Sequence, residues 1–261
     1  MKTIVLSPLD LLVASGFILL AGGLSVAMRL GVEKRLLVAA ARTVIQLTLL
    51  GFLLEGIFKL ANPFLVLLLL FFMTFMAGRE AAARTRKRYL TMMWDTTLAM
   101  GVSAFLVGAV VTQVVVGVKP WYDPQYVIPL LGMILGNALN GVSLALDAFL
   151  DYVTTRREEL ELFLAYGAEA REALASPFRA AVRRGLIPII NAMSVAGVVS
   201  LPGMMTGQIL AGAPPLQAVA YQILVMFMLA GAYALGAVGV VWLCGRKILG
   251  RDLRLKLEIL R

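Results

Sequence analysis

The 261-residue sequence predicts an all-α, polytopic integral membrane protein, and two observations lead to that prediction. Hydrophobic residues make up 61% of the chain and charged residues only 15%, whereas soluble domains have about 45–50% apolar and about 25% charged residues. The apolar residues also gather in runs long enough to cross a bilayer as helices. We therefore expect lipid to be the solvent for one transmembrane domain over residues 1–261.

About seven transmembrane helices are expected, because a helix needs about 20 apolar residues to cross the ~30 Å hydrocarbon core. The third run is short before Arg79, and its helix should continue beyond the membrane through Ala81–Ala83. The first run has no clear cleavage site after it, so it is interpreted as a retained helix. The predicted spans lie near residues 9–28, 36–58, 63–78, 96–118, 126–149, 186–211 and 216–243.

The orientation follows from the lysines and arginines, which concentrate in cytoplasmic segments of membrane proteins. With the N-terminus outside, the inner segments hold 20 basic residues and the outer segments 3. This asymmetry appears only with an odd number of spans. We therefore expect an N-out, C-in, multi-pass protein of the cell (inner) membrane.

The one long loop, residues 150–185, lies on the predicted cytoplasmic side. Its apolar residues recur at spacings of three and four with charges between them, which predicts amphipathic helix. Gly167 is suited to ending one helix, and Pro177 to beginning the next. We expect two short helices, at 156–166 and 177–184.

Composition excludes several classes of function. The net charge of +9 comes from short basic clusters between apolar runs, not from one soluble face, so nucleic acid is not an expected partner. The chain has no histidine and a single cysteine, Cys244, which argues against zinc, haem and iron–sulfur sites and against a histidine-dependent catalytic triad. No cofactor and no nucleotide-binding motif is expected in this chain, which we interpret as a non-enzyme.

The fifth span carries polar side chains along one face. At 100° per residue these residues fall within a stripe about 80° wide, which we call the polar stripe: Met133, Asn137, Asn140, Asp147 and Asp151. Polar groups are costly in a membrane and mark either a substrate path or hydrogen bonds between helices. Both interpretations stay open, and Asp147 could also lie at headgroup level.

The second span carries Arg42 and Gln46 on one face, and Glu55 near its outer end. Arg42 lies about 9 Å inside the span from Leu36, at a depth that Asp147 could match. We hypothesise an Arg42–Asp147 ion pair, with extension of Arg42 to the inner surface as the alternative.

The sixth span contains a Pro-Gly pair at Pro202 and Gly203, where a helix loses its regular hydrogen bonds. Broken helices at mid-membrane expose backbone groups to substrate in many transporters, although a packing kink is the alternative. The candidate substrate contacts beside the break are Met204, Met205, Thr206 and Gln208.

Three stretches, 41–47, 132–141 together with Asp147, and 200–210, resemble the FetB/YbbM family over essentially the whole chain. These proteins are permease subunits of an iron-export ABC transporter, related to plant aluminium-tolerance permeases. The resemblance implies a homodimer, and a separate cytoplasmic ABC ATPase that binds ATP and Mg²⁺. It makes the loop 150–185 the coupling element, and within it Tyr166, Gly167 and Ala168. The family often has Leu-Gly-Ala at this place, so Tyr166 is a departure.

The substrate stays open between iron, another metal ion and a nucleotide sugar. Asp147 and Asn137 offer oxygen ligands and Met133 a soft sulfur, so these three are the metal candidates. Three other classes are also open. An ion-gradient-driven secondary transporter would use Asp147 or Glu55, an intramembrane enzyme would use Asp147 with Asp151, and an assembly scaffold would use neither.

Overall fold

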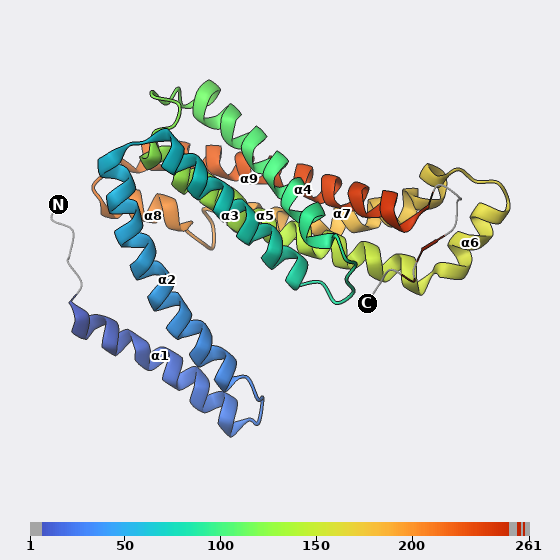
Figure 1. Ribbon diagram of the computed structural model, residues 1–261. Coiled ribbons are helices and arrows are strands. Elements are labelled where there is room, and N and C mark those ends of the chain that lie inside the picture. The colour runs from blue at the N-terminus through green and yellow to red at the C-terminus, as the bar shows by residue number, and fades with distance from the viewer. Residues whose placement is uncertain (1–6, 251–254, 257, 259–261) are drawn as a thin grey trace. The chain divides into compact units, whose positions relative to one another are not determined.

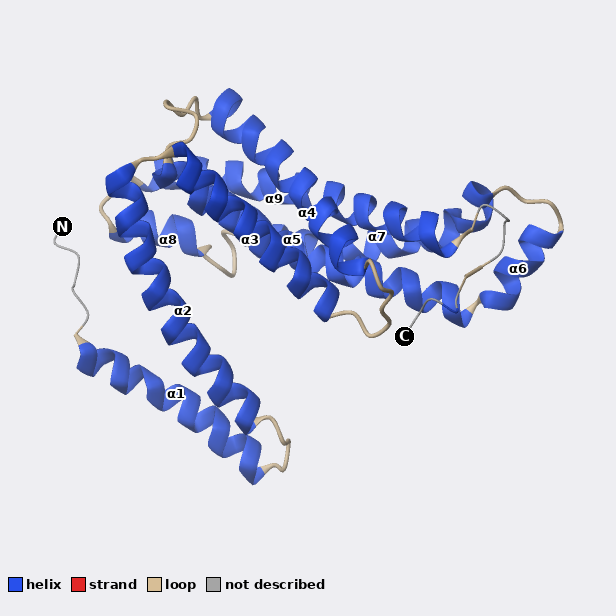
Figure 2. Cartoon of the chain, viewed as in Figure 1, coloured by secondary structure: helices blue, strands red, loops and turns tan. Residues whose placement is uncertain are grey.

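The computed structural model describes residues 7–250, 255, 256 and 258, and in these residues every regular element is a helix (Figure 2). The all-α prediction is confirmed. The helices are α1 (Pro8–Ala27), α2 (Glu33–Leu60), α3 (Pro63–Ala83), α4 (Met92–Ala109), the π-helix η1 (Val110–Val115), α5 (Pro124–Thr155), α6 (Arg157–Ala165), α7 (Ala170–Val195), α8 (Gly203–Leu210) and α9 (Pro215–Ile248). Several exceed the predicted spans because helix continues into the flanking polar residues, as expected at Ala81–Ala83.

The chain divides into two compact units. The first holds the residues up to Asn62 with Leu210–Gly212, and the second holds Pro63–Ile209 with the residues from Ala213 onward. In the first unit, α1 and α2 form a helical hairpin. The Ser25 hydroxyl closes its turn by donating to Glu33 Oε2 at 2.9 Å and accepting from the Val32 N–H at 3.1 Å.

The first unit buries few of its side chains, and Ile57 is the one buried residue on α2. Large apolar side chains such as Phe17, Leu47 and Phe52 are more than half exposed. An apolar helix surface of this extent requires a nonpolar environment. Lipid or another protein chain must therefore cover these helices.

In the second unit, α7 packs antiparallel to both α5 and α9 (Figure 1). Close to their middles, α5 and α7 approach at Gly141 and Gly185, where a Cβ on Gly185 would lie 2.8 Å from the Gly141 carbonyl oxygen. Near the start of α7, Leu174 lies against Gly245 in the last turn of α9. Small residues permit these approaches, as they do between membrane helices generally.

The five long helices of the second unit alternate in direction along the chain. Helix α4 runs antiparallel to α9, since Ser103 lies near Gly236 while Ala99 lies near Gly239. Helix α3 is antiparallel to α4 as well, and its Gly78 carbonyl accepts from the Thr96 hydroxyl at 2.7 Å. One end of the unit therefore gathers the last turns of α3, α5 and α9 and the first turns of α4 and α7. We call it the basic end.

Within the described residues, six helices are long and apolar enough to cross a membrane, where seven spans were predicted. The predicted sixth span, 186–211, is not one helix, because α7 ends at Val195 and α8 has only eight residues. Between them the N–H groups of Val198, Val199 and Ser200 all turn back to the Val195 carbonyl. The break expected at Pro202–Gly203 is present, and it begins earlier, at residue 196.

The predicted second loop helix, 177–184, is wrong in its bounds. Helix α7 begins at Ala170 and passes through Pro177 without interruption to Val195. A reciprocal capping box of Glu169 and Glu172 starts it, because these carboxylates satisfy the first free N–H groups. The predicted first loop helix, 156–166, corresponds to α6.

Candidate substrate path and coupling element

The polar stripe of α5 lies beside the basic segment that follows α3, residues 84–88. The Arg84 guanidinium donates to the Asn140 side-chain oxygen at 2.7 Å. The Arg86 backbone N–H donates to Asp147 Oδ1 at 3.0 Å. Since both acceptors were predicted as path residues, the part of the stripe nearer the basic end holds this segment in place as well as offering polar groups.

The same pattern continues to the end of α5. Lys87 forms an ion pair with Asp151 at 3.3 Å and donates to the Thr154 hydroxyl. The Asp151 side chain is 66% exposed, and ion pairs this open contribute little to stability. These contacts position the segment rather than bury charge.

The other half of the stripe has fewer protein partners. Asn137 is half-buried and donates to the Met133 carbonyl one turn back, at 2.9 Å, which leaves its side-chain oxygen available. Met133 is also half-buried. Asn137 and Asp147 are ten residues apart, about 15 Å along the helix, so one ion cannot bind both. As metal candidates they can act only as two separate sites that an ion would occupy one after the other. In the described part of the chain, no three acidic or thiol side chains form a cluster that could hold an ion.

Arg42 and Gln46 lie on α2, in the first unit, and both side chains are exposed. The contact that the structure gives Asp147 is the Arg86 N–H. The Arg42–Asp147 pair therefore stays a prediction. Glu55, the alternative carboxylate on α2, forms an exposed ion pair with Lys59 at 2.7 Å.

At 100° per residue the four candidate residues after the break spread around α8, with Thr206 about 160° from Gln208. Met204, Met205, Thr206 and Gln208 are all half-buried. The Thr206 hydroxyl donates back to the Pro202 carbonyl at 3.2 Å, one turn earlier. Buried oxygens without a hydrogen-bond donor in the described residues are found on Gln208 and, early in α9, on Gln222. An unpaired buried carbonyl is costly, so both glutamines are candidates for contact with a ligand.

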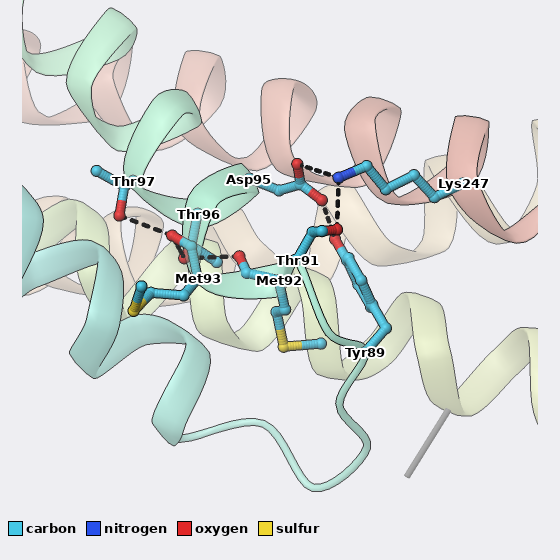
Figure 3. A network of polar contacts seen from close by, with 8 residues as sticks. All are labelled: Tyr89, Thr91, Met92, Met93, Asp95, Thr96, Thr97 and Lys247. Carbon is cyan, nitrogen blue, oxygen red and sulfur yellow. Dashed lines mark hydrogen bonds and ion pairs between the residues drawn. The ribbon is translucent and has the colours of Figure 1, made fainter. Parts of the chain in front are cut away.

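A network of polar side chains that the sequence analysis did not single out closes the basic end (Figure 3). Lys247 Nζ lies 2.7 Å from Asp95 Oδ1 and donates to the Thr91 hydroxyl at 2.6 Å. The Tyr89 hydroxyl donates to Asp95 Oδ2 at 2.6 Å. Burial, with a smaller contribution from nearby Cys244, raises the pKa of Tyr89 far above its usual range. The phenol therefore remains a donor to the carboxylate at every physiological pH.

Two local signals could have revealed this network. Asp95 lies in the first turn of α4 and Lys247 in the last turn of α9, where the helix dipoles favour a negative and a positive charge respectively. The Asp95 side chain is 8% exposed. A buried carboxylate needs a cation and a hydrogen-bond donor, and here it has both.

The predicted coupling residues lie in the turn between α6 and α7. Gly167 has φ of +86°, and the turn is a Schellman motif, with the Ala168 N–H bound to the Phe163 carbonyl and the Gly167 N–H to that of Leu164. This geometry presents Tyr166 at the tip, where it is 84% exposed. The glycine was predicted to end the helix, and it does so.

Helix α6 also exposes an apolar face. Leu160 is buried against the rest of the unit, while Leu162 and Phe163 are 57% and 52% exposed. At 100° per residue they lie within about 100° of each other on the side of the helix that carries Tyr166, and Leu162 is on the side opposite Leu160. Exposed apolar clusters of this kind mark sites for protein partners.

Comparison with known proteins identifies the family. Residues 8–249 match the uncharacterised protein family UPF0014. A UPF0014 membrane protein of Synechocystis is 42% identical over 200 residues, which is 77% of each chain. The "Probable iron export permease protein FetB" of Escherichia coli is 34% identical over 84% of this chain and 83% of its own length.

A plant relative is similar over a comparable length. The "Protein ALUMINUM SENSITIVE 3" of Arabidopsis thaliana is 32% identical over 87% of this chain and 82% of its own length. No solved structure matches the chain. With a family match over nearly the whole sequence and relatives named as membrane and permease proteins, the chain belongs to the UPF0014 family of multi-pass membrane proteins.

Proposed function

We propose that this protein is the membrane-spanning subunit of an ABC transporter that exports iron or another metal ion, driven by ATP that a separate subunit hydrolyses. The observation that supports the proposal best is the exposed apolar face of α6 with Tyr166 at its end. A membrane protein that presents such a face outside its helical bundle needs a partner to cover it. The relative named as an iron export permease supports the direction and the substrate class.

The same proposal gives the protein an N-out, C-in orientation in the inner membrane, with the basic end in the cytosol. Basic residues flank the membrane mainly on the cytoplasmic side. Helix α7 is not apolar enough along its length to qualify as a span, since Arg171, Arg179, Arg183 and Arg184 lie in its first part. Its antiparallel packing nevertheless returns the chain to the end where α5 begins. Counted with α8, it would supply the seventh passage.

Helix α7 offers a direct mechanical link between the partner and the path. It begins after the Gly167 turn and ends at the break before α8, about 39 Å away. Its close contact with α5, at Gly185 and Gly141, would be the point about which α7 rotates. A displacement of α6 by the partner subunit would then move the break before α8, because a packed helix moves as a rigid element.

The substrate path in this proposal follows Asn137 and Asn140 on α5 and Gln208 on α8. Amide and carboxylate oxygens suit hard metal ions, and the unpaired oxygen of Gln208 adds one more. The metal ion is the transported substrate. Several sites of low affinity in succession suit transport, because the ion must be able to leave each of them. A homodimer of the permease would bury part of the exposed apolar surface of α1 and α2.

The test is co-purification with the ABC ATPase subunit encoded in the same genome, followed by metal uptake into inverted vesicles. We expect F163A/Y166A to lose the ATPase and ATP-driven transport. The matched control is R157Q/E161Q, which removes an exposed ion pair of 2.7 Å on the same helix and should retain both. Transport that survives ATP depletion but stops with an uncoupler would make the protein a secondary transporter instead.

A further inference from the structure

A pocket of about 910 Å³ opens at the basic end, between the last turns of α5 and α9 and the first turns of α7. Its volume is in the range that small-molecule ligands fill. Apolar side chains from all three helices line it: Phe149, Leu174, Phe178, Val241, Trp242 and Leu249. No residue of the polar stripe, of α8 or of the α6–α7 turn contributes to this lining, so the pocket is separate from the proposed path.

Three arginines stand around the pocket: Arg171 and Arg179 on α7, and Arg246 on α9. Among the residues that the structure describes, no carboxylate lies within ion-pair distance of any of them. The Arg246 guanidinium instead stacks over the Trp242 ring, 4.7 Å from its centroid. Three cations that the described residues leave without an ion pair, around one apolar cavity, attract an anionic group attached to an apolar body.

The position of the pocket, at the end of a predicted membrane span, indicates which class of ligand it can bind. Helix α9 qualifies as a membrane span and ends at Ile248, so Trp242 and Arg246 lie in its last two turns. Tryptophan and arginine at the end of a span are typical of the layer in which lipid headgroups meet water. Trp242 is 52% exposed, so its ring is accessible from outside the protein.

We propose that this pocket binds one anionic phospholipid, with an acyl chain against Phe149 and Phe178 and the phosphate between the three arginines. Guanidinium groups bind phosphate oxygens through strong, paired hydrogen bonds. Basic pockets between membrane helices on the cytoplasmic side bind anionic headgroups in this way. The site joins α7 to α9, so lipid occupancy would hold the start of α7 in place.

The three tryptophans of the chain make a direct measurement possible. A W94F/W121F variant keeps Trp242 as its one tryptophan, and phospholipids with brominated chains quench a tryptophan that they touch. In vesicles of phosphatidylcholine with phosphatidylglycerol, we expect brominated phosphatidylglycerol to bind beside Trp242 at least about tenfold more tightly than brominated phosphatidylcholine. The W121F/W242F variant, which reports from the exposed Trp94, should show nearly equal binding of the two lipids.

The arginine pairs on α7 provide matched variants. R171Q/R179Q should lower the preference at Trp242 by about tenfold or more, whereas R183Q/R184Q removes the same charge from the same helix outside the pocket and should leave it unchanged. A175F keeps every arginine but fills the pocket, since Ala175 is part of its lining, and it should abolish the preference.

Several results would overturn the proposal. Equal quenching of Trp242 by both lipids, or none by either, would mean that no anionic lipid is bound there and that protein or unselected lipid covers the site. An equal loss of lipid preference in R183Q/R184Q would mean that the overall charge of the helix, and not the pocket, causes the preference. Reversal of the quenching by millimolar inorganic phosphate would assign the arginines to a free anion.

Discussion

Lys247 in the last turn of α9 lies 2.7 Å from Asp95 in the first turn of α4, although 152 residues separate them in the sequence. Because the Asp95 side chain is almost fully buried, this pair fixes how the two helices meet at the basic end. Tyr89 completes the arrangement by donating to the second carboxylate oxygen. The contact joins an interhelical loop and two spans in one place.

We expect K247M to lower the stability of the protein by about 3 kcal/mol, because it leaves Asp95 charged without a cation. The double variant D95N/K247M should lose less than the sum of the two single changes. Thermal unfolding in detergent, carried out as a double-mutant cycle, measures the difference. Strictly additive effects would mean that the pair contributes no interaction energy.

The single cysteine provides an independent measure of the same region. Cys244 lies in α9 and is fully buried, so a maleimide reagent should label it only after local or global unfolding. K247M should speed labelling about tenfold for each ~1.4 kcal/mol by which it lowers the free energy of unfolding, if labelling follows global opening. Rapid labelling of the native wild-type protein would contradict the packing described for α9.

The glycine contact between α5 and α7 should tolerate no side chain. A Cβ at Gly185 would lie 2.8 Å from the Gly141 carbonyl oxygen, so G185A should cost about 1–3 kcal/mol through overpacking. G136A is the matched control, because nothing lies within 4 Å of a Cβ at Gly136. Thermal midpoints in detergent should fall for G185A and stay level or rise slightly for G136A.

D147N separates the two roles of Asp147. An asparagine oxygen can still accept from the Arg86 N–H, so we expect the protein to insert and to keep its stability within about 1 kcal/mol. Loss of the negative charge should nevertheless weaken metal export, measured as cellular metal accumulation at equal expression. D151N is the control, since Asp151 is largely exposed. Full export by D147N would remove Asp147 from the path.

Only a residue that tolerates a positive φ should be able to replace Gly167. With φ at +86°, a valine there costs about 1–2 kcal/mol, whereas asparagine occupies such positions more readily. We expect G167V to reduce co-purification of the ATPase subunit and G167N to retain most of it. Equal membrane levels of the two variants serve as the control for insertion.

The sequence by itself determined those features that depend on neighbouring residues. Apolar runs predicted seven spans, and six of them correspond to described helices that qualify as spans, since backbone hydrogen bonds in lipid must be satisfied within a helix. Gly167 marked the end of α6, and Pro202–Gly203 marked a break. The continuous α7 was missed, because a capping box at Glu169 outweighed the proline signal at Pro177.

Only the tertiary structure decided which polar groups meet. The stripe on α5 was visible as a pattern, but its partners, Arg84 and the Arg86 N–H, come from the segment after α3. Asp95 and Lys247 belong to no recognisable pattern in the sequence, where each is an ordinary charge at the end of a helix. They form an ion pair only because α4 and α9 pack together. Local hydrogen bonds set a helix from its own residues, whereas contacts between helices depend on side chains distant in the sequence.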